Sequence, residues 1–189
     1  MTEGLPLRPV TVPNAVSAVR LLGVPLFLWL LLVERADAWA LVVIAVAGAT
    51  DWLDGWIARR FDQSSRLGEL LDPAIDRLYI LAILCGFALR GLVPWWLVAL
   101  LVGRDVVLTF LLVPLRRRGI VGLPVTFLGK TATFLLLWGF PFLLAGSLVW
   151  GMATFWLTVG WAMVTWGTFL YLLTGLAYAR QAGRALRTT

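Results

Sequence analysis

The sequence predicts an all-α integral membrane protein with six transmembrane helices and both termini in the cytoplasm. Three observations predict this class. Of the 189 residues, 61% are hydrophobic and 14% are charged, whereas soluble domains are about 45–50% apolar and about 25% charged. The mean hydropathy is +0.91. The chain also carries 11 tryptophans, a residue that gathers at bilayer interfaces. We expect residues 1–189 to form one transmembrane domain.

A helix that crosses a bilayer needs about 20 mostly apolar residues. The apolar stretches predict six such helices, at residues 13–33, 38–59, 69–90, 94–115, 124–147 and 152–178. The first stretch is not predicted to be a cleaved signal peptide. It contains Asn14 and Arg20, and it lacks a basic start followed by a small-residue cleavage site.

The arginines predict the orientation of the helices. One set of connectors carries most of them: Arg8, Arg59, Arg60, Arg66, Arg116, Arg117, Arg118, Arg180, Arg184 and Arg187. The opposite connectors carry only Arg35, which Glu34 and Asp37 offset, and Arg90. Cytoplasmic loops have an excess of Lys and Arg, so both termini and the 59–68 connector are placed in the cytoplasm. Near the opposite ends lie the residues of an expected aromatic belt, Trp39, Trp95, Trp96 and Trp150.

Composition also limits the chemistry. The net charge of +6 comes from 15 Arg and one Lys against 10 acidic residues, and in a membrane protein we attribute this surplus to topology and lipid attraction, with no nucleic-acid partner. The single cysteine, Cys85, excludes an intrachain disulfide and a Cys-rich metal site. The chain has no His. Any bound metal must therefore be held by oxygen atoms.

Four aspartates are spaced to lie on two helix faces, because steps of three and four residues return to the same side of a helix. The set on the second helix is Asp51, Asp54, Gly55 and Ala58, and the set on the third is Gly68, Asp72 and Asp76. The short 60–67 connector makes these helices antiparallel neighbours. We therefore expect the four carboxylates to converge at the cytoplasmic end of the pair.

Four anions this close would repel one another unless cations neutralise them. Hard divalent cations prefer carboxylate and phosphate oxygens, and two of them about 3.5–4 Å apart can serve a phosphoryl displacement. Gly55, Ala58 and Gly68 leave room for a nucleotide between the helices, and Arg59 offers a planar fork for phosphate. The neighbouring charged residues are better explained as solvated side chains at helix ends. They are Asp62, Glu69, Arg60 and Arg66.

The run Asp51-x2-Asp54-Gly55-x2-Ala58-Arg59-x8-Gly68-x3-Asp72-x3-Asp76 resembles the signature of the CDP-alcohol phosphotransferases at every defined position. The resemblance implies two Mg²⁺ or Mn²⁺ ions held by the four aspartates, with Asp76 also acting as general base toward the acceptor hydroxyl. It further implies a homodimer and a CDP pocket formed by Asp51, Asp54, Gly55, Ala58, Arg59 and Gly68.

Three further stretches resemble the glycerol-type branch of that family. Pro13-Asn14-x2-Ser17-x2-Arg20-x4-Pro25 is similar to its first helix, and Asp72-Pro73-Ala74-Ile75-Asp76-Arg77 to its Asp-Pro form. Residues 123–134 resemble the CMP-forming cardiolipin synthase members. Gly103-Arg104-Asp105 departs from many phosphatidylglycerophosphate synthases, which carry Arg-Glu there. The resemblance implies CDP-diacylglycerol as donor and phosphatidylglycerol as acceptor, with glycerol 3-phosphate as the alternative acceptor.

Other polar residues are candidates for substrate contacts. Asn14, Ser17 and Arg20 share one helix face, and we expect them to contact the CDP-diacylglycerol donor. Lys130, the only lysine, and Arg104 are candidates for binding the anionic acceptor. Lys130 could instead extend to the interface, and Arg104 could instead form a structural ion pair with Asp105. The cluster Arg116–Arg118 is typical of a topogenic, headgroup-binding segment.

We expect a transferase of the cell membrane, with its active site on the cytoplasmic side. Two other classes of protein fit the sequence less well. An ion transporter would need carboxylates at the membrane midplane or on both sides of it, whereas all four cluster at one end. A non-catalytic CDP-lipid-binding protein would have no need of all four aspartates.

Overall fold

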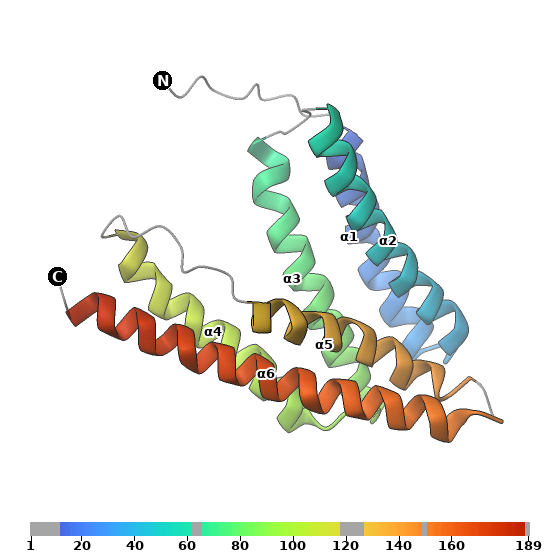
Figure 1. Ribbon diagram of the computed structural model, residues 1–189. Coiled ribbons are helices and arrows are strands. Elements are labelled where there is room, and N and C mark those ends of the chain that lie inside the picture. Colours follow the sequence, from blue (N-terminus) through green and yellow to red (C-terminus); the bar gives the residue numbers. More distant parts are fainter. Residues whose placement is uncertain (1–11, 62–65, 118–126, 149–150, 188–189) are drawn as a thin grey trace. The chain divides into compact units, whose positions relative to one another are not determined.

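The computed structural model describes residues 12–61, 66–117, 127–148 and 151–187, with side chains for residues 21–50, 77–111, 127–148 and 151–183. These ranges contain six helices and no strand (Figure 1). The helices are α1 (Val12–Leu32), α2 (Asp37–Phe61), α3 (Arg66–Leu89), α4 (Trp95–Arg117), α5 (Phe127–Ala145) and α6 (Ala153–Arg187). The predicted all-α class is confirmed. The first five helices begin and end within about three residues of their predicted bounds.

The end predicted for the last helix, residue 178, is wrong: α6 continues to Arg187. The prediction ended the helix where the apolar run ends, but hydrophobicity limits only the part of a helix that can lie in lipid. The segment after Tyr178 is rich in Ala, Arg, Gln and Leu and contains no Pro. These are strong helix formers in water, so the helix continues beyond its apolar part.

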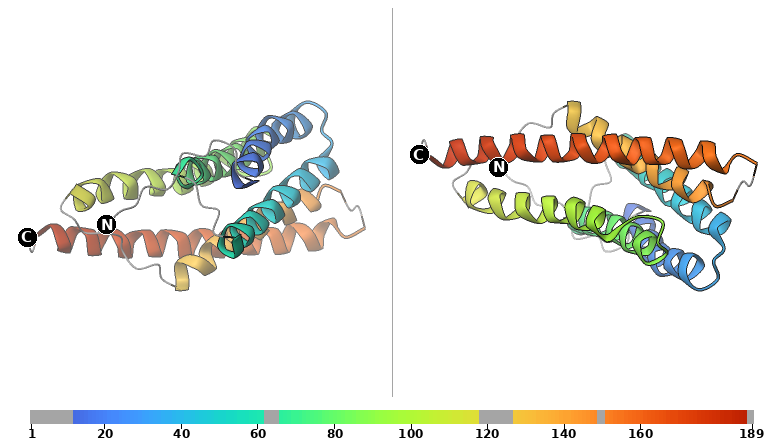
Figure 2. Two further views of the ribbon diagram at one scale, coloured as in Figure 1. Left: turned by 90° about the horizontal axis from the view of Figure 1, so that it is seen from above. Right: turned by 90° about the horizontal axis from the view of Figure 1, so that it is seen from below.

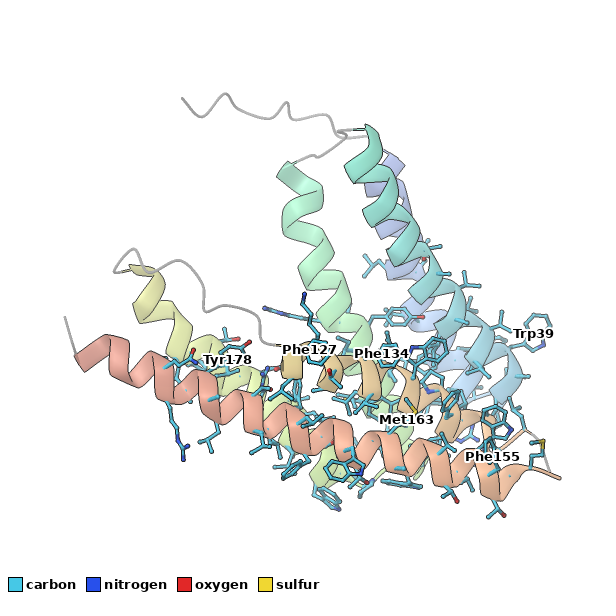
Figure 3. All side chains as sticks on the ribbon, viewed as in Figure 1. Trp39, Phe127, Phe134, Phe155, Met163 and Tyr178 are labelled. Atoms are coloured by element: carbon cyan, nitrogen blue, oxygen red, sulfur yellow. The ribbon has the colours of Figure 1, made fainter. Side chains whose placement is uncertain are left out.

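Two helical stretches of the described residues are long and apolar enough to cross a membrane, Phe127–Ala145 and Ala153–Gly183. Shorter apolar stretches, Leu21–Leu32, Asp37–Thr50 and Arg77–Leu89, belong to the first three helices. Six spans and cytoplasmic termini remain predictions. The exposed side chains of Trp39, Trp95 and Trp96 lie in the first turns of their helices, as an aromatic belt requires, and Trp39 projects outward from α2 (Figure 3). Trp150 lies outside the described residues.

By its contacts the chain divides into two compact units, Met1–Gly91 and Leu92–Thr189. In the first unit α1 packs against both α2 and α3. The fully buried Phe27 of α1 lies beside two rings of α3, with centroid distances of 6.5 Å to Tyr79 and 6.4 Å to Phe87. A Cβ atom added to Gly86 of α3 would lie 3.0 Å from Leu31. The small residue therefore permits the close approach of α1 and α3.

An ion pair joins three helix ends of this unit. Arg90, one residue beyond α3, pairs with Asp37, the first residue of α2, at 2.9 Å between Nη1 and Oδ1. The same guanidinium donates a hydrogen bond to the carbonyl oxygen of Leu31, near the end of α1. Arg90 thereby satisfies one of the carbonyl groups that a helix leaves unpaired at its C-terminus.

In the second unit α5 packs along α6, and α6 also contacts α4; the pairing of α5 with α6 is visible from above and below in Figure 2. Glycines bring α5 and α6 close together. A Cβ atom on Gly160 of α6 would lie 2.9 Å from the backbone nitrogen of Leu143, and one on Gly139 of α5 would lie 2.8 Å from Val164. Small residues at such contacts are typical of helices that pack in lipid, where close van der Waals contact drives association.

Candidate active site

The backbone of the aspartate motif is helical in the structure. Asp51 to Arg59 lie in the C-terminal half of α2, and Gly68, Asp72 and Asp76 lie in the N-terminal half of α3. The side chains of both segments lie outside the described residues. Their convergence therefore remains a prediction. Among the described side chains, no group of three His, Cys, Asp or Glu residues could hold a metal ion.

One contact gives the register of α2 and α3. The hydroxyl of Tyr79, on α3, lies 3.4 Å from the carbonyl oxygen of Val43, on α2. The two helices run in opposite directions in this unit (Figure 1). At 1.5 Å per residue, Asp51 lies about 12 Å along α2 from Val43, and Asp72 about 10 Å along α3 from Tyr79, on the same side of the contact. The two motif segments thus reach the same end of the first unit.

Tyr79 also ties this register to the first helix. The residue is 7% exposed, its ring lies near Phe27, and a Cβ atom on Gly23 of α1 would be 3.7 Å from it. The segment that holds Asn14, Ser17 and Arg20 is the N-terminal half of α1. Its side chains lie outside the described residues, but its helix contacts both α2 and α3.

In the second unit, three polar side chains form a cluster between α4 and α6. Nη1 of Arg104 lies 2.9 Å from Oδ1 of Asp105, and the hydroxyl of Tyr171 donates a 2.6 Å hydrogen bond to the same oxygen. The Arg104 guanidinium lies over the Tyr171 ring, with Cζ 4.0 Å from the centroid. The ion pair considered from the sequence therefore forms, and a residue of α6 completes it.

Tyr171 was missed by the sequence analysis, although a signal existed. Thr168, Tyr171, Gly175 and Tyr178 recur at three- and four-residue steps in the apolar helix α6, which puts them on one face. Thr168 is buried, and Gly175 faces Arg104 so closely that an added Cβ would lie 2.9 Å from both Cγ and Nε of the arginine. A face of small and hydroxyl-bearing residues on such a helix indicates contact with another helix.

An open groove of about 330 Å³ runs beside this cluster. Among the described residues that line it, Arg104 is the only charged one; the others are Ala99, Leu100, Gly103, Val107, Leu108, Leu172, Gly175, Leu176 and Ala179. The Arg104 side chain is 16% exposed. Its Nε atom is buried and has no hydrogen-bond partner among the described residues. The groove thus combines an apolar surface with one incompletely bonded cation.

Lys130 lies in the first turn of α5 and is exposed. Among the described side chains it has no ion-pair partner. The hydroxyl groups of its neighbours Thr131 and Thr133 donate hydrogen bonds to backbone carbonyls one turn earlier. Arg104 is on α4 and Lys130 on α5, and the described contacts of both helices are with α6. The structure therefore does not join the two candidate acceptor residues.

Sequence comparison identifies the family. The sequence model of the CDP-alcohol phosphatidyltransferases matches residues 10–170, which include the whole aspartate motif and the Arg104 cluster apart from Tyr171. The chain belongs to the CDP-alcohol phosphatidyltransferase family. The resemblance predicted from the motif is confirmed, and the protein is an enzyme of a membrane-bound family that transfers phosphatidyl groups from a CDP-linked lipid.

Several curated relatives of this phosphatidyltransferase are similar over almost its whole length. It is 46% identical over 185 residues to the CMP-forming cardiolipin synthase of Streptomyces coelicolor, covering 95% of this chain and 86% of that protein. It is 43% identical to a putative cardiolipin synthase of Mycobacterium tuberculosis, with the same coverage. A CDP-diacylglycerol–glycerol-3-phosphate 3-phosphatidyltransferase of Pseudomonas fluorescens is 33% identical, over 94% of this chain and 92% of that protein.

Proposed function

We propose that this protein is a CMP-forming cardiolipin synthase, which transfers the phosphatidyl group of CDP-diacylglycerol to phosphatidylglycerol. One observation carries the choice of acceptor. The relatives named for cardiolipin synthesis are 43–46% identical over 95% of the chain, whereas the relative named for glycerol 3-phosphate is 33% identical over nearly the same length. Because all of these proteins share one family, the difference bears on the acceptor and not on the type of reaction.

The proposed metal ligands are Asp51, Asp54, Asp72 and Asp76. The helical backbone of both motif segments supports this assignment, as does the register that brings them to one end of the first unit. The donor set suits hard cations, because it consists of carboxylates in a chain that contains no His. Two Mg²⁺ or Mn²⁺ ions, when bound there, would offset the carboxylate charges and stabilise the charge on the phosphate oxygens.

The other candidate residues would bind the two substrates. Gly55, Ala58 and Gly68 would leave space for the cytidine, and Arg59 would bind phosphate through its planar fork. Asn14, Ser17 and Arg20 of α1 would contact the phosphates or the glycerol of the donor. Arg104 and Lys130 are proposed as acceptor residues. Since they lie on different helices, separate substitutions of Arg104 and of Lys130 test the two assignments.

The proposed reaction is a single displacement. Asp76 accepts the proton of the primary hydroxyl of phosphatidylglycerol. The oxygen of that hydroxyl then forms a bond to the phosphorus that bears the diacylglycerol, and the bond from this phosphorus to the bridging oxygen breaks. CMP leaves with the electron pair of the broken bond, and the product is cardiolipin.

The proposed setting is a cell membrane, crossed six times, with the active site and both termini on the cytoplasmic side. Six helices of suitable length, the exposed Trp residues in the first turns of α2 and α4, and the bias of arginines toward one set of connectors support it. A homodimer is proposed from the family resemblance alone. Crosslinking of the protein in native membranes tests the dimer, and cysteine labelling of the connectors tests the orientation.

The acceptor can be tested directly. Purified protein in lipid nanodiscs is supplied with labelled CDP-diacylglycerol, Mg²⁺ or Mn²⁺, and either phosphatidylglycerol or glycerol 3-phosphate, and the products are identified by mass. We expect cardiolipin and CMP only when phosphatidylglycerol is present. Product formed only with glycerol 3-phosphate would replace the proposal with the phosphatidylglycerophosphate synthase activity. No transfer to either acceptor would contradict both.

A further inference from the structure

Arg104 has more hydrogen-bonding capacity than its described neighbours use. A guanidinium group carries five N–H donors. Among the described residues, Nη1 donates to Asp105, and the Nε atom is buried without an acceptor. Asp105 is shared, since the same carboxylate oxygen also accepts the hydroxyl of Tyr171, and the Asp105 side chain is 53% exposed. An ion pair of purely structural function would be better satisfied.

The position of Arg104 along α4 indicates a function for its unpaired hydrogen-bond donor. The residue lies 9 positions after Trp95 and 12 before Arg116, so it is about 13 Å and about 18 Å along the helix from the two expected interfaces. Ionisable groups at such depth are costly and usually mark a binding site or a transport path. A long arginine could reduce this cost by extending toward the interface, but here its guanidinium stays over the Tyr171 ring.

Two residues of α6 hold Arg104 in this position. The Tyr171 ring covers one face of the guanidinium at 4.0 Å, and its hydroxyl holds the carboxylate of Asp105 at 2.6 Å. Gly175, one turn further along, accepts the arginine stem where any larger residue would collide with it. A cation whose rotation is restricted in this way loses less entropy on binding an anion.

The groove beside Arg104 indicates the chemistry of the ligand. Its volume of about 330 Å³ lies within the range of about 300–1,000 Å³ that is typical of small-ligand sites. Leu100, Val107, Leu172 and Leu176 give it an apolar wall. A small water-soluble phosphate has no group to place on this wall, whereas the acyl chain of a phospholipid does. Charge complementarity supports the same class of ligand, since a guanidinium forms strong, charge-assisted hydrogen bonds with phosphate oxygens.

We propose that the groove between α4 and α6 binds the phosphatidylglycerol acceptor, whose phosphodiester pairs with Arg104, and that Tyr171 is the positioning residue that orients Arg104. This inference rests on the proposed function and makes it more specific, because it assigns the acceptor lipid to named residues of the second unit. CDP-diacylglycerol has the same phosphate and acyl chemistry. The experiment must therefore distinguish the two lipids.

Steady-state kinetics separate the donor from the acceptor. We expect Tyr171→Phe, which keeps the ring but removes the bond to Asp105, to raise KM for phosphatidylglycerol about tenfold, as the loss of one hydrogen bond to a charged group predicts. Tyr171→Leu removes the ring as well and should raise it further. In both variants KM for CDP-diacylglycerol should stay within about twofold of the wild type. Trp166→Phe, which changes an exposed aromatic residue of the same helix outside the groove lining, is the control and should leave both constants unchanged.

A binding measurement that does not depend on turnover completes the test. Phosphatidylglycerol with a photoreactive diazirine on one acyl chain should label peptides that contain Leu100 or Leu176. Unlabelled phosphatidylglycerol should suppress this labelling, and CDP-diacylglycerol should not. Arg104→Gln should lose the labelling, while the Trp166→Phe control retains it.

Three results would overturn the inference: a rise in KM for the donor instead of the acceptor, labelling that CDP-diacylglycerol displaces, or Tyr171 variants that change only the melting temperature. Each leaves the proposed function intact if the wild-type enzyme still forms cardiolipin. Conversely, a wild-type enzyme that transfers only to glycerol 3-phosphate would contradict the proposed function whatever the Tyr171 variants do.

Discussion

Arg90 and Asp37 form a two-point ion pair, with Nη1 2.9 Å from Oδ1 and Nη2 3.2 Å from Oδ2. Their side chains are only 16% and 10% exposed. The pair closes the end of the first unit that lies opposite the aspartate motif, where α1 ends and α2 begins. Its effect should therefore appear in stability and not directly in the chemistry.

Replacing Arg90 with Ala should lower the free energy of unfolding by about 3 kcal/mol, because it leaves a largely buried carboxylate without its partner. Thermal unfolding of the purified protein in one detergent measures the loss. Arg35→Ala, an exposed arginine in the connection between α1 and α2, is the matched control and should change stability by less than about 0.5 kcal/mol. Equal effects of the two changes would show that the pair contributes nothing specific.

The contact between α5 and α6 predicts a second stability effect. Gly160→Ala would place a Cβ atom 2.9 Å from the backbone nitrogen of Leu143, and backbone cannot move aside as a flexible side chain can. We expect a loss of about 1–3 kcal/mol from overpacking. Gly183→Ala is the control on the same helix, since nothing lies within 4 Å of the added atom. It should stabilise α6 by up to about 1 kcal/mol.

Asp76→Asn tests the proposed general base. The amide cannot accept the hydroxyl proton, so kcat should fall by a factor on the order of 10²–10⁴. Binding of CDP-diacylglycerol should be largely kept, which a thermal-shift titration with the donor measures independently of turnover. Asp62→Asn, beyond the end of α2, serves as the control and should retain activity. An Asp76→Asn enzyme with wild-type kcat would remove this residue from the role of base.

Removal of divalent metal should silence the enzyme reversibly. After treatment with EDTA and exchange into metal-free buffer, CMP release from CDP-diacylglycerol should stop, and either Mg²⁺ or Mn²⁺ should restore it. Ca²⁺ is the informative comparison, because it binds oxygen ligands at longer distances and with looser geometry. Full activity in metal-free buffer would contradict the assignment of the four aspartates as metal ligands.

Most of the fold could be predicted from the sequence because the length of an apolar run limits the length of a helix in lipid. This explains why the bounds of α1 to α5 agree within about three residues. Hydrophobicity sets no limit beyond the apolar run, and the end of α6 was accordingly misplaced by nine residues, from 178 to Arg187.

The candidate site was predictable to a different degree in each unit. Fixed spacing within α2 and α3 predicted that the aspartates of the motif share helix faces, because such periodicity is local, and the backbone of both segments is helical. The partner of Arg104 was not predictable in the same way. Asp105 precedes Tyr171 by 66 residues, and no local pattern states which of the later helices will pack against α4.

The glycine contacts between α5 and α6 also bear on the order in which the second unit forms. The two helices are neighbours in the chain and meet through small residues, so their association closes only a short loop. The contact of α4 with α6, in contrast, joins segments that are far apart in sequence, and such contacts form more slowly. We therefore expect the α5–α6 hairpin to assemble first during biogenesis. Its surface, with Gly175 and Tyr171 already in place, would then act as the template on which α4 docks.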